Sequence, residues 1–330
     1  MEIDAIVEHW QLPSDTQVIS EVTKGVLSTN FIIGTSKQRW FLKRYRFDDG
    51  AKIKEIHGVK RHFSSHGIPV IMPLEGRDES TAFHADDGWY SLFPFIDGRQ
   101  PERELLTPTA LTSAAQLLAK IHLLSKTSPF VVQDIAKDWD GPATLEKAEE
   151  ILAIINAKPK KDDFDLKSEA ILKVKMELVR KNTVSFAELG LSKDTLCHGD
   201  YQEANMFFDE DDRVSWLFDW EKADMEPRTY EVLRAMELMC MNGNFTQRHI
   251  DNAKHFVRSY HEAYPLNHEE LAAGLTGRRI RGIHSIWTMQ QHYIVKNNRS
   301  DRFLEAEYKN IAHIADRARI FEPEILAAVV

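Results

Sequence analysis

Cysteine is scarce in this sequence: Cys197 and Cys240 are the only two among 330 residues. A disulfide framework is therefore not expected, and a reducing cytoplasm fits. No apolar run approaches the roughly 20 residues that a membrane span needs. The first residues carry acidic side chains and lack the basic start and apolar core of a signal peptide. The sequence therefore predicts a soluble, cytoplasmic protein with no membrane partner.

Positive charge is also in short supply, because 42 Lys and Arg residues face 51 Asp and Glu residues, which gives a net charge of −9 at pH 7. A nucleic-acid partner would favour a basic face, so none is expected. The acidic balance has two interpretations: a cleft that attracts a cationic substrate, or a surface charge that only aids solubility. Clustered Cys and His residues are missing too, which argues against structural zinc.

The pattern of the chain changes near residue 98. Before it, β-like runs and one helix are expected; after it, the pattern is mostly helical, apart from one predicted hairpin with an acidic turn. The expected strands are residues 18–22, 30–34, 39–45 and 89–95, and the early helix is 51–66. The later helices are one that starts at Thr107–Pro108, then 168–181, 228–241, 247–263, 269–293 and 302–320, with a loop at 158–165 and the hairpin at 204–209 and 213–220.

Residues with catalytic chemistry gather around this hairpin. Asp200 lies five residues before Asn205, and Asp219 follows on the second hairpin strand. Phosphoryl transfer from ATP needs a carboxylate that accepts a hydroxyl proton and oxygen ligands that hold Mg²⁺. Asp200 is therefore the candidate base, and Asn205 and Asp219 are the candidate magnesium ligands. The alternative is that all three are ordinary turn and strand-end residues.

The His-Gly-Asp run at residues 198–200 with Asn205, followed by Phe-Asp-Trp-Glu at 218–221, resembles the aminoglycoside phosphotransferase superfamily, which includes homoserine and choline kinases. The resemblance implies an α+β, bilobal, protein-kinase-like fold. Its smaller lobe, residues 1–98, would be an antiparallel sheet with one helix that binds nucleotide. Its larger helical lobe, residues 99–330, would carry the catalytic loop and the acceptor site. The implied reaction is ATP-dependent transfer of the γ-phosphate to a hydroxyl of an amino-alcohol, amino-sugar or aminoglycoside-like metabolite.

The same resemblance assigns the nucleotide site in the smaller lobe. Residues 24–31 resemble the turn that covers the phosphates, although the turn holds a single glycine, and Lys43 resembles the lysine that grips them. Glu55 falls where the family's lysine-orienting glutamate lies. Exposed-strand and solvated-charge interpretations remain open for Lys43 and Glu55. The implied nucleotide-binding residues are Lys43, Glu55, Ser28, Thr29, Phe93 and Phe95, the last two in the linker at 92–98.

In the larger lobe, Glu231 stands where the family usually has an aspartate that anchors the catalytic loop. We expect it to support the loop, and His198 to fix Asp200 rather than to shuttle protons. His122 and Cys197 are expected to be interior residues. The acceptor site is the least defined part, because aromatic residues at helical spacing are also typical of a core. Its candidates are Glu203, Glu221, Trp287 and Gln291.

Two departures from protein kinases favour a small-molecule substrate. Protein kinases typically place a lysine two residues after the base and a glycine two residues after the metal-binding aspartate, where this chain has Gln202 and Glu221. No activation segment follows. The partner is thus a small-molecule hydroxyl acceptor, and a monomer or a homodimer is expected. The main alternative is a catalytically silent protein on the same fold, with a protein Ser/Thr kinase less favoured.

Overall fold

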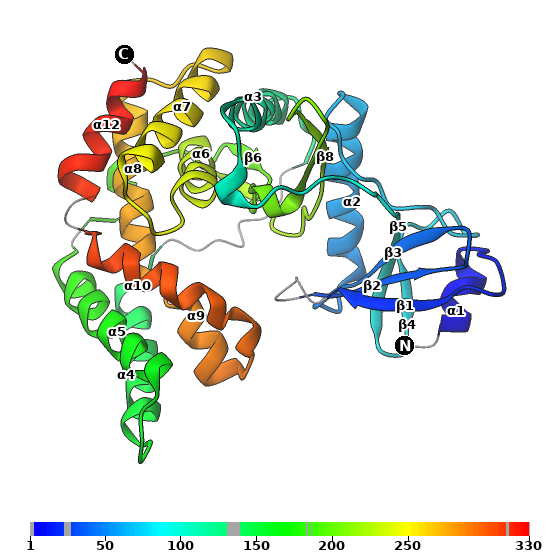
Figure 1. The fold of residues 1–330 in the computed structure, drawn as a ribbon, viewed down its shortest axis with the longest axis horizontal. Helices are drawn as coiled ribbons and strands as arrows, with labels where there is room; N and C mark the ends of the chain where they lie inside the picture. The colour runs from blue at the N-terminus through cyan, green and yellow to red at the C-terminus, as the bar shows by residue number, and fades with distance from the viewer. Residues whose placement is uncertain are drawn as a thin grey trace.

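The chain forms a small antiparallel sheet near its N-terminal end and a larger, mainly helical part (Figure 1). The computed structural model describes residues 3–22, 28–130, 139–182, 184–185, 187–314 and 317–329. Within these ranges no helix has the length and apolarity that crossing a membrane requires. Both the early sheet and the later helices agree with the expected α+β composition.

The sheet has five antiparallel strands in the order β1-β2-β3-β5-β4. The four strands expected from the sequence are present, with ends shifted by one residue, and the short β4 was not predicted. The strands are β1 Gln17–Val22, β2 Thr29–Gly34, β3 Arg39–Arg44, β4 Phe83–Ala85 and β5 Gly88–Pro94.

The two faces of this sheet carry different chemistry because side chains alternate along a strand. On one face Leu42, opposite Leu92, is buried in a cluster with Ile6 of helix α1 (Ile3–His9). The other face carries Lys43 opposite Ser91 and, two positions away, Phe41 opposite Phe93. The lysine and the two aromatic side chains therefore share the face away from α1.

Helix α2 (Gly50–Ser65) begins at Asp49, whose side chain accepts a hydrogen bond from the Lys52 amide at 3.0 Å. This agrees with the helix expected over 51–66. The helix packs on the sheet through Lys60 and Phe93, and its buried Val59 and Phe63 also belong to the core of the helical part. In Figure 1, α2 stands between the sheet and the later helices. The division at residue 98 remains a prediction.

The helical part is built around one large apolar core that α3, α6 and α7 share. Its short strands form two separate pairs, β6 with β9 and β7 with β8, and the second pair is the predicted hairpin. The elements are α3 Pro108–Ser125, α4 Gly141–Asn156, α5 Asp163–Lys181, β6 Thr195–Cys197, β7 Met206–Phe208, β8 Val214–Leu217, β9 Asp224–Glu226, α6 Arg228–Met236, α7 Gln247–Ala263, α8 His268–His284, α9 Trp287–Gln290, α10 Leu304–Ala312 and α12 Glu322–Leu326.

Three predicted helical boundaries were wrong. Helix α5 starts earlier than 168 because Asp162 and Asp165 form a reciprocal capping box inside the expected loop. The helix expected over 269–293 breaks at Ser285, whose carbonyl accepts a hydrogen bond from the Lys175 ammonium at 2.5 Å. The helix expected over 302–320 begins at Leu304 and ends at Ala312.

Candidate active site

The catalytic loop lies between β6 and β7 and depends on one glycine. Gly199 has φ +79°, and a Cβ at this position would lie 1.7 Å from the carbonyl oxygen of Lys222. Only glycine combines this backbone conformation with such a close approach. The loop can therefore turn tightly against the segment that follows Asp219.

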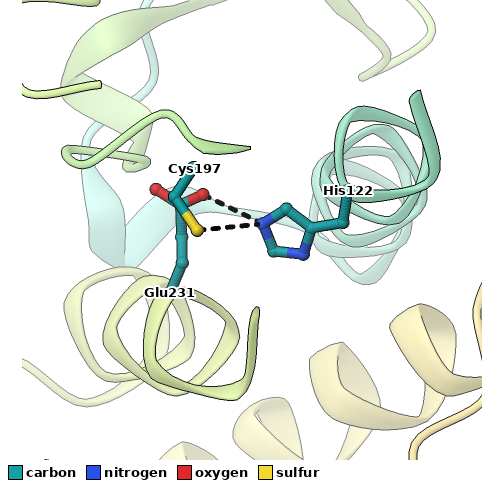
Figure 2. Close-up of side chains that lie close together, drawn as sticks. All are labelled: His122, Cys197 and Glu231. Carbon is teal, nitrogen blue, oxygen red and sulfur yellow. Dashed lines mark hydrogen bonds and ion pairs between the residues drawn. The ribbon is translucent and has the colours of Figure 1, made fainter. Parts of the chain in front are cut away.

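Glu231 lies beside His122 and Cys197 (Figure 2) and holds this loop through its carboxylate. Its Oε1 accepts a hydrogen bond from the Gly199 amide at 2.5 Å, and its Oε2 accepts one from the His198 amide at 2.9 Å. The Oε2 atom also lies 3.0 Å from Nε2 of His122. Burial alone would raise the pKa of Glu231, but these partners lower it. The glutamate thus does the anchoring that the sequence predicts, despite its extra methylene.

The buried cluster of His122, Cys197 and Glu231 has the donor atoms of a metal site, all within 4.8 Å of one another. Each is already engaged, however. His122 Nδ1 lies 2.8 Å from the Tyr260 hydroxyl, and its Nε2 lies 3.9 Å from the Cys197 sulfur as well as near Glu231. Burial raises the pKa of the Cys197 thiol well above its ordinary value, which favours the protonated form. The cluster is satisfied without an ion, as expected for interior residues.

Asp200 lies in the loop with both carboxylate oxygens engaged by cations. Arg234 donates to Oδ1 at 2.7 Å and Lys222 to Oδ2 at 3.1 Å. Gln202 also donates to Oδ1, at 3.0 Å. Burial is the largest influence and would raise the pKa of Asp200, yet Arg234 and Lys222 together hold it well below its ordinary value. The carboxylate is therefore ionised at neutral pH.

The two candidate metal ligands lie on backbone segments that are hydrogen-bonded to each other. Asn205 donates from Nδ2 to the Asp200 carbonyl at 2.8 Å, which leaves its amide oxygen for another partner. Its carbonyl accepts the Phe218 amide at 3.0 Å, which places Asn205 next to Asp219. Asp219 has φ +64°, a strained conformation for a residue with a side chain. One neutral and one anionic oxygen are ligands that suit magnesium.

His198 links the two catalytic segments. Its Nδ1 accepts the Asp200 amide at 3.2 Å, and its Nε2 donates to the Phe218 carbonyl at 2.9 Å. Trp220, which follows Asp219, has its ring centroid 4.5 Å from that of His198 and 4.9 Å from that of Phe63 on α2. Its hydrogen bonds therefore give His198 the positioning role that the sequence predicts, and Trp220, tilted against His198 and stacked on Phe63, extends the connection to α2.

Lys43 reaches across from the sheet to the helical part. Its ammonium lies 2.8 Å from Asp219 and 2.5 Å from Glu221. Burial would lower the pKa of Lys43, but these two carboxylates raise it above its ordinary value. The residue that orients Lys43 in this structure is Glu221, since no ion pair joins the lysine to Glu55 in the described ranges.

Glu221, an acceptor-site candidate from the sequence, is engaged by Lys43, a candidate nucleotide-binding residue. Its carboxylate also accepts a hydrogen bond from the Ser28 hydroxyl at 3.2 Å. Thr29 lies 3.5 Å from a guanidinium nitrogen of Arg44. The preceding part of the predicted phosphate turn, residues 24–27, lies outside the described residues.

The remaining candidates are spread over three places. Phe93 is buried, and Phe95 stacks under Arg39 with the guanidinium carbon 4.1 Å from its ring. Glu203 is buried and paired with Arg103 at 2.9 Å, and burial raises its pKa. Gln291 accepts a hydrogen bond from Asn297 at 3.2 Å. Trp287 lines a cavity of about 390 Å³ with Trp139, His284, Gln290 and Arg281, among others.

Sequence reasoning missed Arg234, Lys222 and Lys60. Arg234 follows Glu231 by three residues on α6, so both reach the same loop. This i, i+3 relation could have indicated it. Lys60 interrupts the apolar stripe of α2, where Ile53, Ile56 and Phe63 are buried, and is itself buried. A lysine at a buried position of the helix was a sequence signal for a special role. No sequence feature pointed to Lys222.

Comparisons with known proteins agree with this geometry. Residues 18–273 match the model of the phosphotransferase enzyme family. Homoserine kinase from Methylobacillus glycogenes is 20% identical over 262 residues, which cover 79% of this chain and 76% of that protein.

Solved structures with the same fold include two phosphotransferases. An aminoglycoside phosphotransferase from Alicyclobacillus acidocaldarius has a TM-score of 0.65 and 16% identity, over 99% of this chain and 96% of that one. A spectinomycin phosphotransferase in complex with ADP and spectinomycin has a TM-score of 0.65 and 16% identity, over 96% of this chain and 97% of that one. They confirm the predicted bilobal, kinase-like fold. The chain belongs to the phosphotransferase enzyme family, as a small-molecule kinase with a hydroxyl acceptor.

Proposed function

We propose that this protein transfers the γ-phosphate of ATP to a hydroxyl of a small amino-alcohol, amino-sugar or aminoglycoside-like metabolite. The observation that carries the proposal is the meeting of three chain segments: Lys43 of β3 pairs with Asp219, and in the loop before β7 Asn205 bonds to the backbone of Asp200 and accepts the Phe218 amide. The ADP bound to the spectinomycin phosphotransferase supports a nucleotide as the donor.

Lys43 is the proposed ligand of the nucleotide phosphates. Ser28 and Thr29, at the turn before β2, are proposed to lie near these phosphates, and Phe93 and Phe95 near the adenine ring. Asn205 and Asp219 would hold magnesium, which neutralises charge on the phosphates when bound. Their oxygen donors fit that ion, because the Asn205 amide nitrogen is committed to the Asp200 carbonyl. Lys43 can turn to the phosphates because its ammonium still has donor capacity beyond its two carboxylate partners.

Asp200 is the proposed base. The acceptor oxygen bonds to the γ-phosphorus, the bond from that phosphorus to the bridging oxygen of ADP breaks, and the hydroxyl proton passes to the Asp200 carboxylate. Lys222, whose side chain is 42% exposed, has room to leave Oδ2 for the incoming hydroxyl. Arg234 is the more buried partner and would keep the carboxylate oriented.

The acceptor would lie near the Trp287 cavity. Arg281 lines this cavity and stacks on Tyr230, with 4.2 Å between its guanidinium carbon and the ring centroid. Tyr230 lies one helical turn before Arg234, the partner of Asp200. This chain of contacts connects the cavity with the proposed base. Glu203 and Gln291 stay acceptor-site proposals of second rank, because both already have partners.

The test is a phosphate-transfer assay with ATP, magnesium and a panel of hydroxyl acceptors. Asp200→Asn should lower kcat by roughly 10²- to 10⁴-fold, while Asp211→Asn, an exposed aspartate in the hairpin turn, should behave as the wild type. Undiminished turnover of Asp200→Asn would reject the base. A wild-type protein that phosphorylates no acceptor and gains no thermal stability from ATP and magnesium would support the catalytically silent alternative.

A further inference from the structure

Helix α2 brings a second lysine to the nucleotide side of the sheet. Lys60 is 4% exposed, and its ammonium lies 4.2 Å above the ring centroid of Phe93. Phe93 pairs with Phe41 on the sheet face that also carries Lys43. The Lys60 ammonium therefore lies on the face that the proposed function gives to the nucleotide.

Among the residues that the structure describes, this ammonium has no anionic partner. The two nearest acidic side chains of the site, Asp219 and Glu221, pair with Lys43. Across the described part of the chain, no carboxylate lies within 4 Å of the Lys60 nitrogen. A buried cation without a partner is costly, so a protein retains one where something else offsets the cost. Contact with the Phe93 ring supplies only a small part of that offset.

The charge balance of the site favours an anion as the missing partner. Lys43 faces two carboxylates, Asp219 and Glu221, so these three groups together carry an excess negative charge. A polyphosphate that approached them alone would be repelled. Lys60 is the additional positive group on the same face. Burial and repulsion from Lys43 lower its pKa well below the ordinary value, and the attraction of an incoming anion for the ammonium would raise that pKa again.

We propose that Lys60 is a second phosphate-binding lysine, which contacts the phosphate chain of the bound nucleotide together with Lys43. The inference rests on the proposed function, because it needs a nucleotide at this face. Its burial is no obstacle, since Lys43, the proposed phosphate ligand of the sheet, is itself only 9% exposed. In this arrangement Glu221 orients Lys43 from the loop, and the contribution of α2 is the cation of Lys60 in place of the carboxylate expected from Glu55.

The test compares Lys60→Met with Lys54→Met, a control on the exposed side of the same helix. Calorimetry would measure binding of ADP, with and without magnesium chloride, and of adenosine. Lys60→Met should weaken ADP binding roughly ten- to hundredfold, the range for a lost hydrogen bond to a charged group, and leave adenosine binding unchanged. It should also raise the melting temperature of the nucleotide-free protein, because an unpaired buried cation is removed. Lys54→Met should change neither quantity.

Two results would overturn the inference: ADP binding equal to that of the wild type, or equal losses for ADP and adenosine, which would mean that Lys60 only packs on Phe93. If Lys60→Met does not fold, Lys60→Gln serves in the same measurements. Failure of the wild type to bind ADP would overturn the proposed function instead, and this inference with it.

Discussion

The anchor of the catalytic loop gives a stability prediction that can be worked out bond by bond. The Glu231 carboxylate accepts the His198 and Gly199 amides and pairs with His122, all in the interior. Glu231→Gln keeps one accepting oxygen, which can serve two of the three donors. Its amide nitrogen is itself a donor and cannot accept a hydrogen bond from the third. One buried N–H is left without a partner, which costs about 1–3 kcal/mol of unfolding free energy.

Glu231→Ala removes both oxygens. All three donors then lose their acceptor, and a cavity opens in the core, so the loss should reach at least about 3 kcal/mol. The order of stability should be wild type, Glu231→Gln, Glu231→Ala. Urea unfolding measures it, with the m-value as a check that each variant unfolds from the same compact state.

Glu262→Gln, on the exposed side of α7, makes the same chemical change without burial and should stay within about 0.5 kcal/mol of the wild type. The reasoning would be refuted if Glu231→Ala and Glu231→Gln were equally stable. It would also fail if both matched the Glu262→Gln control, since the three interior bonds would then contribute nothing.

Three further predictions follow from the site. Lys222→Met should move the acid limb of the pH profile of kcat/KM to higher pH, because loss of one of its two cationic partners raises the pKa of Asp200. If the acid limb does not move, Asp200 does not govern it. Burial, with help from nearby lysines, lowers the pKa of His57 to about 3 in the folded protein. Between pH 6.5 and 3 the unfolded chain therefore binds a proton on His57 that the folded protein does not, so the unfolding free energy should fall as the pH drops through this range. His57→Gln should flatten this slope in urea titrations at several pH values. Ser28→Ala should raise the KM for ATP roughly three- to tenfold, with kcat nearly unchanged, because Glu221, the partner of Lys43, loses a hydrogen bond. Steady-state kinetics measures both constants, and an unchanged KM would contradict a role for the Ser28–Glu221 contact.

The sequence was sufficient for the parts of the site that depend on short spacing. Asp200 and Asn205 share one loop, and the hairpin returns Asp219 to them, so the local pattern was informative. The relevant neighbours of these three residues lie within one loop and one hairpin. Lys43, by contrast, was identified from its resemblance to the phosphate-binding lysine of the family.

Contacts between distant segments could not be predicted in the same way. The choice between Glu55 and Glu221 as the partner of Lys43 depends on how α2 sits against the loop after Asp219, which helical periodicity does not determine. The break at Ser285 depends on Lys175, 110 residues earlier in the chain. Such long-range polar contacts override local propensity, because a buried cation needs its acceptor.

Trp220, stacked on Phe63 and tilted against His198, limits how the two halves of the molecule can move. Phe63 and Trp220 are fully buried and lie at the meeting point of α2 and both catalytic segments. Pulling α2 straight away from them would open a void in close-packed interior, whereas rotation about the stacked rings would keep them in contact. Relative motion of the sheet and the helical part should therefore be a pivot about these rings, with its largest displacements at the far strands of the sheet and its smallest at Asp200.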